Sequence, residues 1–142
     1  MATWSEFSAA APELAERVKE RFEAHKHMTI ATLRSDGSPR ISGTEAAFED
    51  GELWIGSMVN ARKAKDLQRD PRYALHSGSD EPDDWHGDAK IAGRAEEIPG
   101  QEHHKFRLDI GEASTVRLDD AKEHLVIDIW TARGGLKRIK RK

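Results

Sequence analysis

Two adjacent cations, Arg62 and Lys63, follow an apolar run that ends at Gly56, and they begin a segment with helical character. The first turn of a helix offers unpaired backbone N–H groups and a partial positive charge, both of which favour an anion. Arginine adds a planar fork of donors and lysine adds a compact charge, so the pair suits a phosphate group. The sequence therefore predicts that this junction binds a ligand with a phosphate. The alternative is a solvated helix face on which Asp66 pairs with Arg62.

Other residue types that commonly carry catalysis do not form a recognisable pattern, and no catalytic residue is assigned. The chain has no cysteine, which excludes disulfides, thiolate nucleophiles and thiolate metal sites. No serine stands in a Gly-x-Ser-x-Gly elbow, and no nucleophile has an adjacent base. The histidine pairs His25/His27 and His103/His104 lack the spacing of a zinc helix, so we predict no metal site. This pattern fits a protein whose bound cofactor supplies the chemistry.

The composition is that of one globular domain. Charged residues make up 35% of the 142 residues but nearly cancel, with a formal net charge of -3, so no overall field attracts nucleic acid or a membrane. The first residues lack the basic and apolar regions of a signal peptide, and no apolar run is long enough to span a membrane. We expect a cytoplasmic protein without nucleic-acid or membrane partners. The basic residues 136–142 leave an anion or nucleic-acid binder as an alternative.

The phosphate site must be positioned by a mostly β framework. Residues 12 to about 26 are predicted to form an amphipathic helix, because Leu14, Val18 and Phe22 recur every four residues. Two more helices are predicted over 61–70 and about 101–109. Runs of β-forming residues between turns predict strands over 27–33, 41–48, 52–56, 73–77, 89–98, 125–130 and 136–140. Such sequential strands favour a small barrel, and the lack of Gly-x-Gly-x-x-Gly after a strand argues against a dinucleotide-binding sheet.

The tryptophans allow a core or a pocket role. Trp54 and Trp130 are predicted to lie in the core, because each stands within an apolar strand. Trp85 follows the acidic residues 79–84 beside His86, where a pocket and a surface position are equally consistent with the sequence.

Five blocks of the sequence, in this order and at these spacings, resemble the pyridoxamine 5'-phosphate oxidase-like family of FMN-binding split β-barrels. The blocks are Arg34-Ser-Asp-Gly-Ser-Pro39, the strand that begins at Arg40, Gly51-Glu-Leu-Trp-Ile-Gly-Ser57, Ala61-Arg-Lys63 with Leu67, and Asp70-Pro-Arg-Tyr-Ala-Leu75. The resemblance covers residues 27–98 well and the remainder loosely. It implies a mainly β fold with a few helices, a split β-barrel of the FMN-binding type, in a single domain over residues 1–142.

The resemblance also implies which residues bind the cofactor. Arg62 and Lys63 match the family's Arg-Lys pair on the FMN phosphate, and Arg40 matches the arginine that begins the neighbouring cofactor-binding strand. The other implied positions, on two strands whose backbone meets the isoalloxazine and ribityl chain, are Ile41, Ser42, Gly56 and Ser57. In such barrels the cofactor lies at a subunit interface, so a homodimer is implied as well.

The implied activity is that of a flavin-dependent oxidoreductase, which transfers a hydride to or from a small organic substrate. Two departures argue against vitamin B6 oxidation itself. Glu45 stands near the place of a lysine in the oxidase, and Arg138 is followed two residues later by Lys140 rather than by a histidine.

The identity of the cofactor has an alternative. Short members of the superfamily bind the deazaflavin F420, whose polyglutamate tail the basic residues 137–142 could accommodate. FMN is preferred because Arg62-Lys63 copies the FMN pair. A non-catalytic flavin-binding or sequestering protein stays open as the alternative function, and haem is a further ligand that this resemblance permits.

Overall fold

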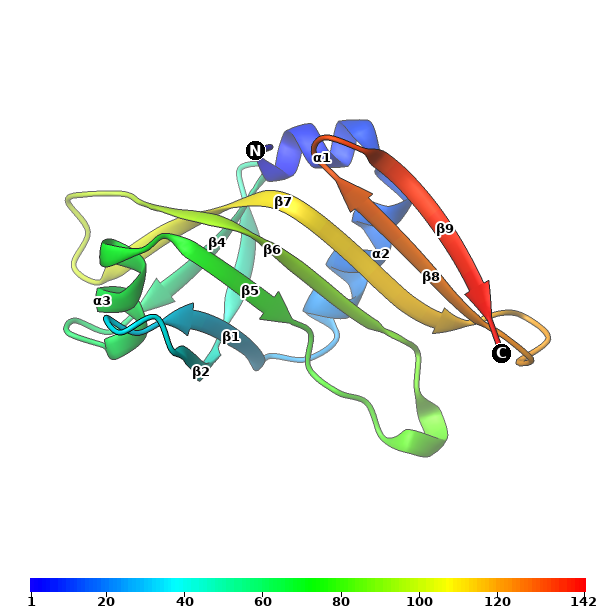
Figure 1. The fold of residues 1–142 in the computed structure, drawn as a ribbon. Coiled ribbons are helices and arrows are strands. Elements are labelled where there is room, and N and C mark those ends of the chain that lie inside the picture. The colour runs from blue at the N-terminus through cyan, green and yellow to red at the C-terminus, as the bar shows by residue number, and fades with distance from the viewer.

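The computed structural model describes all 142 residues, and it is mainly antiparallel β with a few helices, as the sequence predicts (Figure 1). The helices are α1 Trp4–Ala10, α2 Pro12–Glu23, α3 Arg62–Arg69 and a short 3-10 helix, η1 Pro82–Asp84. The strands are β1 Met28–Leu33, β2 Pro39–Thr44, β3 Ala46–Glu49, β4 Glu52–Ser57, β5 Arg72–His76, β6 Asp88–Glu97, β7 His104–Leu118, β8 Leu125–Thr131 and β9 Gly135–Arg141. None of the helices is long and apolar enough to cross a membrane.

All nine strands belong to one sheet, which curls into an open barrel. Its main path runs β2-β1-β5-β6-β7-β4-β3, and β8 and β9 continue from β7 in a separate direction. β7 is long enough to pair with two different strands on the same side. It pairs with β4 up to Arg107 and with β8 from Glu112 onward. β2 lies against β4 without pairing with it, so the barrel stays open along the edge of β2. This open edge brings the predicted site residues together.

The long β6–β7 hairpin bends at a bulge. The pairing register shifts between Ala92 and Gly93, which inserts an extra residue and increases the local twist. A side chain at Gly93 would overlap the carbonyl oxygen of Asp109 on the facing strand. The bend therefore requires glycine at this position. Because of the bend, β6 and β7 take part in both halves of the curled sheet.

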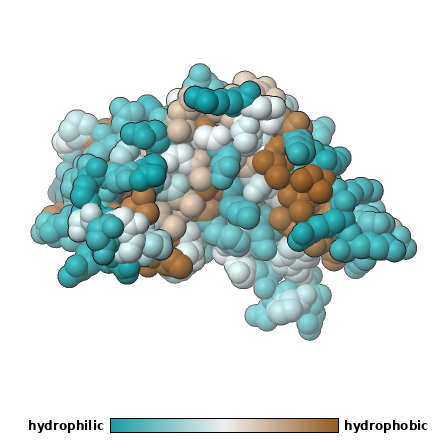
Figure 2. Space-filling view, viewed as in Figure 1, coloured by the Kyte–Doolittle hydropathy of each residue, from teal (hydrophilic) through white to brown (hydrophobic).

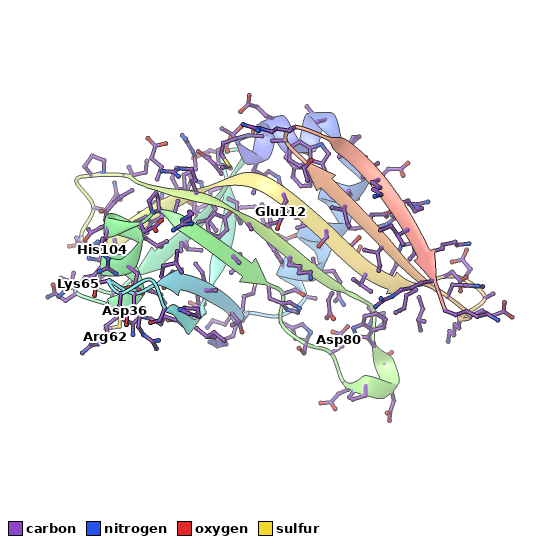
Figure 3. The ribbon with its side chains drawn as sticks, viewed as in Figure 1. Asp36, Arg62, Lys65, Asp80, His104 and Glu112 are labelled. Carbon is purple, nitrogen blue, oxygen red and sulfur yellow. The ribbon has the colours of Figure 1, made fainter.

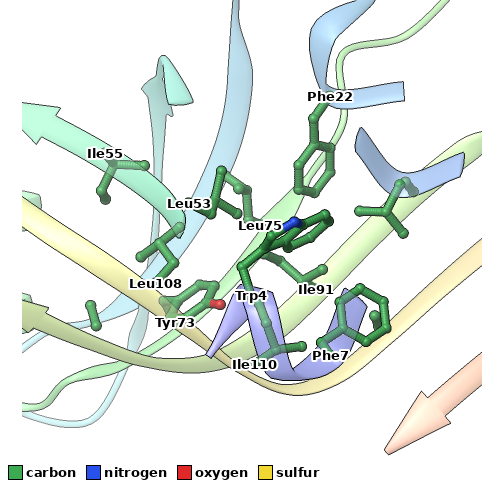
Figure 4. Close-up of a cluster of buried hydrophobic side chains, with 14 of the residues drawn as sticks. Trp4, Phe7, Phe22, Leu53, Ile55, Tyr73, Leu75, Ile91, Leu108 and Ile110 are labelled. Carbon is green, nitrogen blue, oxygen red and sulfur yellow. The ribbon is translucent and has the colours of Figure 1, made fainter. Parts of the chain in front are cut away.

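Helices α1 and α2 cover the core on one face of the sheet. Side chains from both helices pack with those of the central strands in a cluster of 23 buried hydrophobic residues (Figure 4). Phe7 and Val18 are fully buried there, and Trp4 makes an edge-to-face contact with Phe7 at a centroid distance of 5.2 Å. Trp130 is also buried, which confirms its predicted core position. The amphipathic spacing of α2 is thus explained by the sheet against which it packs.

Helix α1 was not expected from the sequence, although its start carries a signal. The Thr3 hydroxyl accepts from the backbone N–H of Glu6, and the Glu6 carboxylate accepts from the backbone N–H of Thr3. This reciprocal pair is a capping box, readable as Thr-x-x-Glu before a short apolar run. The predicted helix over 12–26 is confirmed in position but ends at Glu23.

The helix predicted over about 101–109 is wrong, because His104 begins β7. Phe106 and Ile110 lie four residues apart, a spacing that fits one helical face and one face of a strand equally well. Leu108, midway between them, is also fully buried, and this alternation has the period of two that defines a strand. The strand predicted over 41–48 is similarly divided, since β2 ends at Thr44 and β3 begins at Ala46.

The basic C-terminal residues form β9, a strand exposed along its whole length at the edge of the sheet. Lysines and arginines on an edge strand hinder pairing with other chains. Figure 2 shows an otherwise mostly hydrophilic face with an apolar patch over β8 and β9, where Leu136 and Ile139 are exposed. β9 and α3 lie at opposite ends of the molecule (Figure 1), so the basic tail is far from Arg62 and Lys63 of the same chain.

Candidate functional site

Three cavities follow the open edge of the barrel around β2. The first, called here the cationic cavity, has a volume of about 390 Å³ and lies between the β1–β2 turn and α3. The middle cavity, of about 480 Å³, lies between the ends of β2 and β4. The tryptophan cavity, of about 790 Å³, extends beyond it and shares Glu45, Gly56 and His103 with the middle one. The predicted site residues are distributed along this row.

The cationic cavity has an excess of positive side chains. Its lining includes five cations and two carboxylates, namely Arg34, Arg40, Arg62, Lys65, Arg69, Asp36 and Asp66. Figure 3 shows Asp36, Arg62 and Lys65 close together at one end of the molecule. Arg62 and Lys65 form no ion pair within the chain, and both are exposed. They lie three apart on α3, so they occupy the same helix face and can meet one anion together.

A buried carboxylate holds the arginines of this cavity in place. Asp66 accepts from Arg40 Nε at 2.7 Å, from the Thr32 hydroxyl at 2.8 Å and from Arg69 Nη2 at 2.9 Å. Burial by itself would raise the pKa of Asp66, but the hydrogen bonds from Arg40, Thr32 and Arg69 outweigh it and lower the pKa. Asp66 therefore stays ionised and fixes Arg40, and it does not pair with Arg62 as the solvated-face interpretation proposed.

The middle cavity contains Lys63 and a hydroxyl without a partner. Lys63 Nζ donates to the carbonyl oxygen of Gly43 at 2.8 Å, which ties α3 to β2. Burial lowers the pKa of Lys63, since the charged form loses hydration there. Ser57 is buried, and its hydroxyl has no hydrogen-bond partner in the chain. A buried hydroxyl left without a partner indicates a place where a ligand atom can bind.

Two glycines leave the strand backbones beside this cavity open. A Cβ at Gly43 would have no atom within 4 Å, and one at Gly56 would come no closer than 3.9 Å to another atom, the carbonyl oxygen of His104. Packing within the chain therefore does not explain why glycine occupies these positions. A glycine in a strand is typical where another molecule approaches the backbone closely.

The tryptophan cavity differs from the prediction for Trp54. This ring is half-buried and lines the cavity rather than the core, with Lys105 Nζ 4.6 Å from its centroid. On the same wall, His104 Nδ1 lies 2.7 Å from a carboxylate oxygen of Glu97. Trp85 lines none of the three cavities, and its Nε1 donates to Asp88 at 3.3 Å.

The structure places five of the seven predicted site residues in two cavities. Arg40 and Arg62 line the cationic cavity, whereas Gly56, Ser57 and Lys63 line the middle one. Ile41 and Ser42 connect the two along β2, and Ile41 is 74% exposed. The adjacent cations thus point in different directions, as neighbours on a helix do.

Sequence reasoning missed Gly43, Lys65 and Asp66. Lys65 shares a helix face with Arg62, a relation that the three-residue spacing could have revealed. The hydrogen bond from Arg40 to Asp66 joins residues 26 apart, so no local spacing in the sequence could predict it. No group of three or more His, Cys, Asp or Glu side chains is arranged to hold a metal ion.

Solved structures with the same fold include proteins of different function. PhzG from Burkholderia lata 383, in complex with tetrahydrophenazine-1-carboxylic acid, is 12% identical with a TM-score of 0.65, covering 96% of this chain and 88% of that one. An FAD-binding protein from Mesorhizobium loti is 19% identical with a TM-score of 0.59, covering 71% and 92%. HutZ, the haem storage protein from Vibrio cholerae, is 16% identical with a TM-score of 0.56, covering 68% and 89%. At these identities the likeness establishes the fold alone.

Sequence comparison goes further. No curated protein sequence matches the chain significantly. The family model described as pyridoxamine 5'-phosphate oxidase matches residues 14–130, a span from α2 to the end of β8 that contains every residue of the three cavities. The chain therefore belongs to the pyridoxamine 5'-phosphate oxidase-like family of split β-barrels.

Proposed function

We propose that this protein is an oxidoreductase that binds FMN along the open edge of β2. The proposal rests on the order of the cavities along that edge. The cationic cavity comes first, and next to it lies the middle cavity, where two glycines leave the backbone accessible and the Ser57 hydroxyl has no partner. A flavin mononucleotide presents a phosphate at one end and a flat ring at the other, and this order of environments matches its two ends. An FAD-binding structure of the same fold supports a flavin as the ligand class.

The phosphate would bind at the cationic cavity. Arg62 and Lys65 are free to donate, and Arg40 keeps its two terminal guanidinium nitrogens available because only Nε donates to Asp66. Charge-assisted bonds from arginine to phosphate are among the stronger polar contacts in proteins. α3 begins at Arg62 without a side-chain cap, so its first backbone N–H groups add to the same positive potential.

The ring and its ribityl chain would lie over Gly43, Gly56 and Ser57. The two glycines allow the backbone to approach a flat ring, and the Ser57 hydroxyl gains the partner that it lacks within the chain. Lys63, held against Gly43, contributes a positive charge beside the ring. Bound FMN supplies hydride transfer, while these side chains bind and orient it and the tryptophan cavity provides space for a small organic substrate.

Titration of the purified protein with FMN tests the proposal. We expect saturable quenching of FMN fluorescence at one FMN per chain, and a bound flavin absorbance that bleaches under a reductant. Parallel titrations with F420 and with haem examine the two competing ligands, since one structural neighbour is a haem storage protein. A protein that binds F420 or haem but not FMN would overturn the choice of cofactor. FMN binding without turnover of any reducible substrate would favour a flavin-sequestering protein.

We also propose that two copies assemble into a homodimer at this edge. Ile41, Met58 and Val59 are 74%, 79% and 59% exposed. Met58 lines the middle cavity, Val59 follows it in the chain, and Ile41 lies two residues before Gly43 of the same cavity. Apolar side chains at such exposure gain stability when a partner covers them. Sedimentation at micromolar concentration should give a mass about twice 16.0 kDa. Replacing Met58 and Val59 by serine should shift the mass toward one chain, and a wild-type monomer that binds FMN fully would contradict the assembly.

A further inference from the structure

A fourth cavity lies away from the proposed FMN site, between α2 and the sheet. It has a volume of about 170 Å³, and its walls come from the middle of α2, the start of β6 and the end of β7. It shares no lining residue with the three cavities along β2. Figure 3 shows Asp80, whose loop packs against α2 beside this cavity, far from Arg62.

This cavity collects most of the unpartnered buried polar atoms of the chain. Only four buried side-chain polar atoms have no hydrogen-bond partner, and three of them belong to Arg21, Thr115 and Arg117, which all line this cavity. They are Arg21 Nε, Thr115 Oγ1 and Arg117 Nε. Arg21 is 9% exposed and Thr115 is 3% exposed, so bulk water does not satisfy them. Both arginine atoms can only donate, which means that the cavity offers donors that need an acceptor.

The chain supplies no acceptor for these donors. Arg21 Nη1 donates to Asp80 at 2.6 Å and to the carbonyl oxygen of Gly87, but its Nε remains free. The Arg117 side chain forms no hydrogen bond or ion pair within the chain, and its charge adds to those of Arg138 and Arg17 in lowering the pKa of Asp128. Asp128 stands opposite Thr115 on β8, and its carboxylate is already bound by Arg17 and by Arg138.

The charges facing the cavity favour an anion. Three arginines line it, namely Arg17, Arg21 and Arg117, against Glu20 and Asp88. Glu20 is exposed to solvent, and an oxygen of Asp88 accepts from Trp85 Nε1 at 3.3 Å. His86 also lines the cavity, and its Nδ1 lies 3.4 Å from a carboxylate oxygen of Asp80. Arg17 and Arg21 are each paired with a buried carboxylate, Asp128 and Asp80, whereas Arg117 forms no ion pair, so one arginine charge stays available to an anion.

We propose that this cavity is a second ligand site, which binds a small tetrahedral oxyanion, a phosphate group, separately from the flavin. Donors from α2 and from β7 face one another across the cavity, an arrangement that suits an acceptor with oxygens in several directions. Arginine is the preferred residue for such an anion. Water fits the site less well, because each water brings two donors of its own into a cavity rich in donors.

The size of the cavity limits the ligand. At roughly 30 Å³ for each water molecule, 170 Å³ equals the space of about five or six waters. This volume accommodates a phosphate with a few further atoms and excludes a flavin. The phosphate can come from free inorganic phosphate or from a small phosphorylated metabolite, and both present the same group to the arginines.

Calorimetric titration with inorganic phosphate tests the site. The variants are Arg117→Gln, which removes an unpaired guanidinium, and Thr115→Val, which removes the hydroxyl while keeping the shape of the side chain. Arg133→Gln is the matched control, because Arg133 is an exposed arginine that forms no ion pair. Arg62→Gln separates this site from the cationic cavity, which is also able to bind phosphate.

We expect saturable phosphate binding in the wild type, in Arg133→Gln and in Arg62→Gln, weakened at least about tenfold in Arg117→Gln and in Thr115→Val. A small sugar phosphate that binds more tightly than inorganic phosphate would identify a metabolite as the source, and equal or weaker binding would identify the free anion. Phosphate binding that is lost only in Arg62→Gln, or that is unchanged in Arg117→Gln, would overturn the proposal. Thermal melting with and without phosphate checks that each variant is folded, and an Arg117→Gln or Thr115→Val variant that is folded but binds normally counts against the site.

Discussion

Replacing Arg62 and Lys63 together by alanine is expected to weaken FMN binding about 10²- to 10³-fold, which corresponds to roughly 3–4 kcal/mol. Arg62 lines the cationic cavity, and Lys63 lines the middle one, so the double variant removes a cation from each end of the proposed ligand. Fluorescence quenching of FMN measures the affinity. The fold should persist, because Arg62 is exposed and Lys63 contributes one hydrogen bond, to Gly43.

The single variants and a matched control sharpen this result. Arg62→Ala should reduce affinity for FMN more than for riboflavin, which lacks the phosphate, whereas Lys63→Ala should reduce both by a similar factor. Lys65→Ala should resemble Arg62→Ala, since the two side chains share the cationic cavity. The control is Lys137→Ala with Lys140→Ala on β9, which removes the same charge at the opposite end of the molecule. Equal losses in the α3 and β9 variants would show that overall charge, rather than a phosphate site, sets the affinity.

Asp66→Asn is expected to lower the free energy of unfolding by about 3 kcal/mol. The buried Asp66 carboxylate accepts hydrogen bonds from Arg40, Thr32 and Arg69, and an asparagine amide would turn donors toward two guanidinium groups. Urea denaturation measures the change. Asp36→Asn is the control, because Asp36 is exposed and bonds only to Ser38, so this substitution should leave the free energy of unfolding nearly unchanged. Similar losses for both variants would contradict the role assigned to Asp66.

The same carboxylate should contribute to acid sensitivity. The pKa of Asp66 is lower in the folded chain than its ordinary value of 3.8, so the folded state holds fewer protons there than the unfolded state. Its stabilising contribution is complete above about pH 4 and is lost as the pH falls through the lowered pKa. Urea midpoints of the wild type and of Asp66→Asn should therefore converge below pH 4, and a constant difference between them down to pH 2 would contradict this linkage.

The local features of this protein follow from residues that are close together in the sequence. The Asp36-Gly37 turn, the apolar run before Gly56 and the spacing of Leu14, Val18 and Phe22 predicted a mainly β fold with an amphipathic helix, and the structure confirms both. The resemblance of five short blocks predicted the family, which the family model confirms over residues 14–130. These features depend on residues close in sequence, where turn chemistry and the periodicity of apolar residues fix the result.

The directions in which the functional side chains point depend on how the strands pair and the helices pack. Phe106 and Ile110, four apart, fit a helix and a strand equally, and pairing with β4 and β6 selected the strand. Arg62 and Lys63 are adjacent in sequence yet face different cavities, because neighbours on a helix diverge by about 100°. Asp66 accepts a hydrogen bond from Arg40, which lies 26 residues away in the sequence. The proposed oxyanion site is likewise formed by residues of α2 and of the end of β7. Such contacts are set by strand pairing and helix packing across the whole chain, which no local spacing encodes.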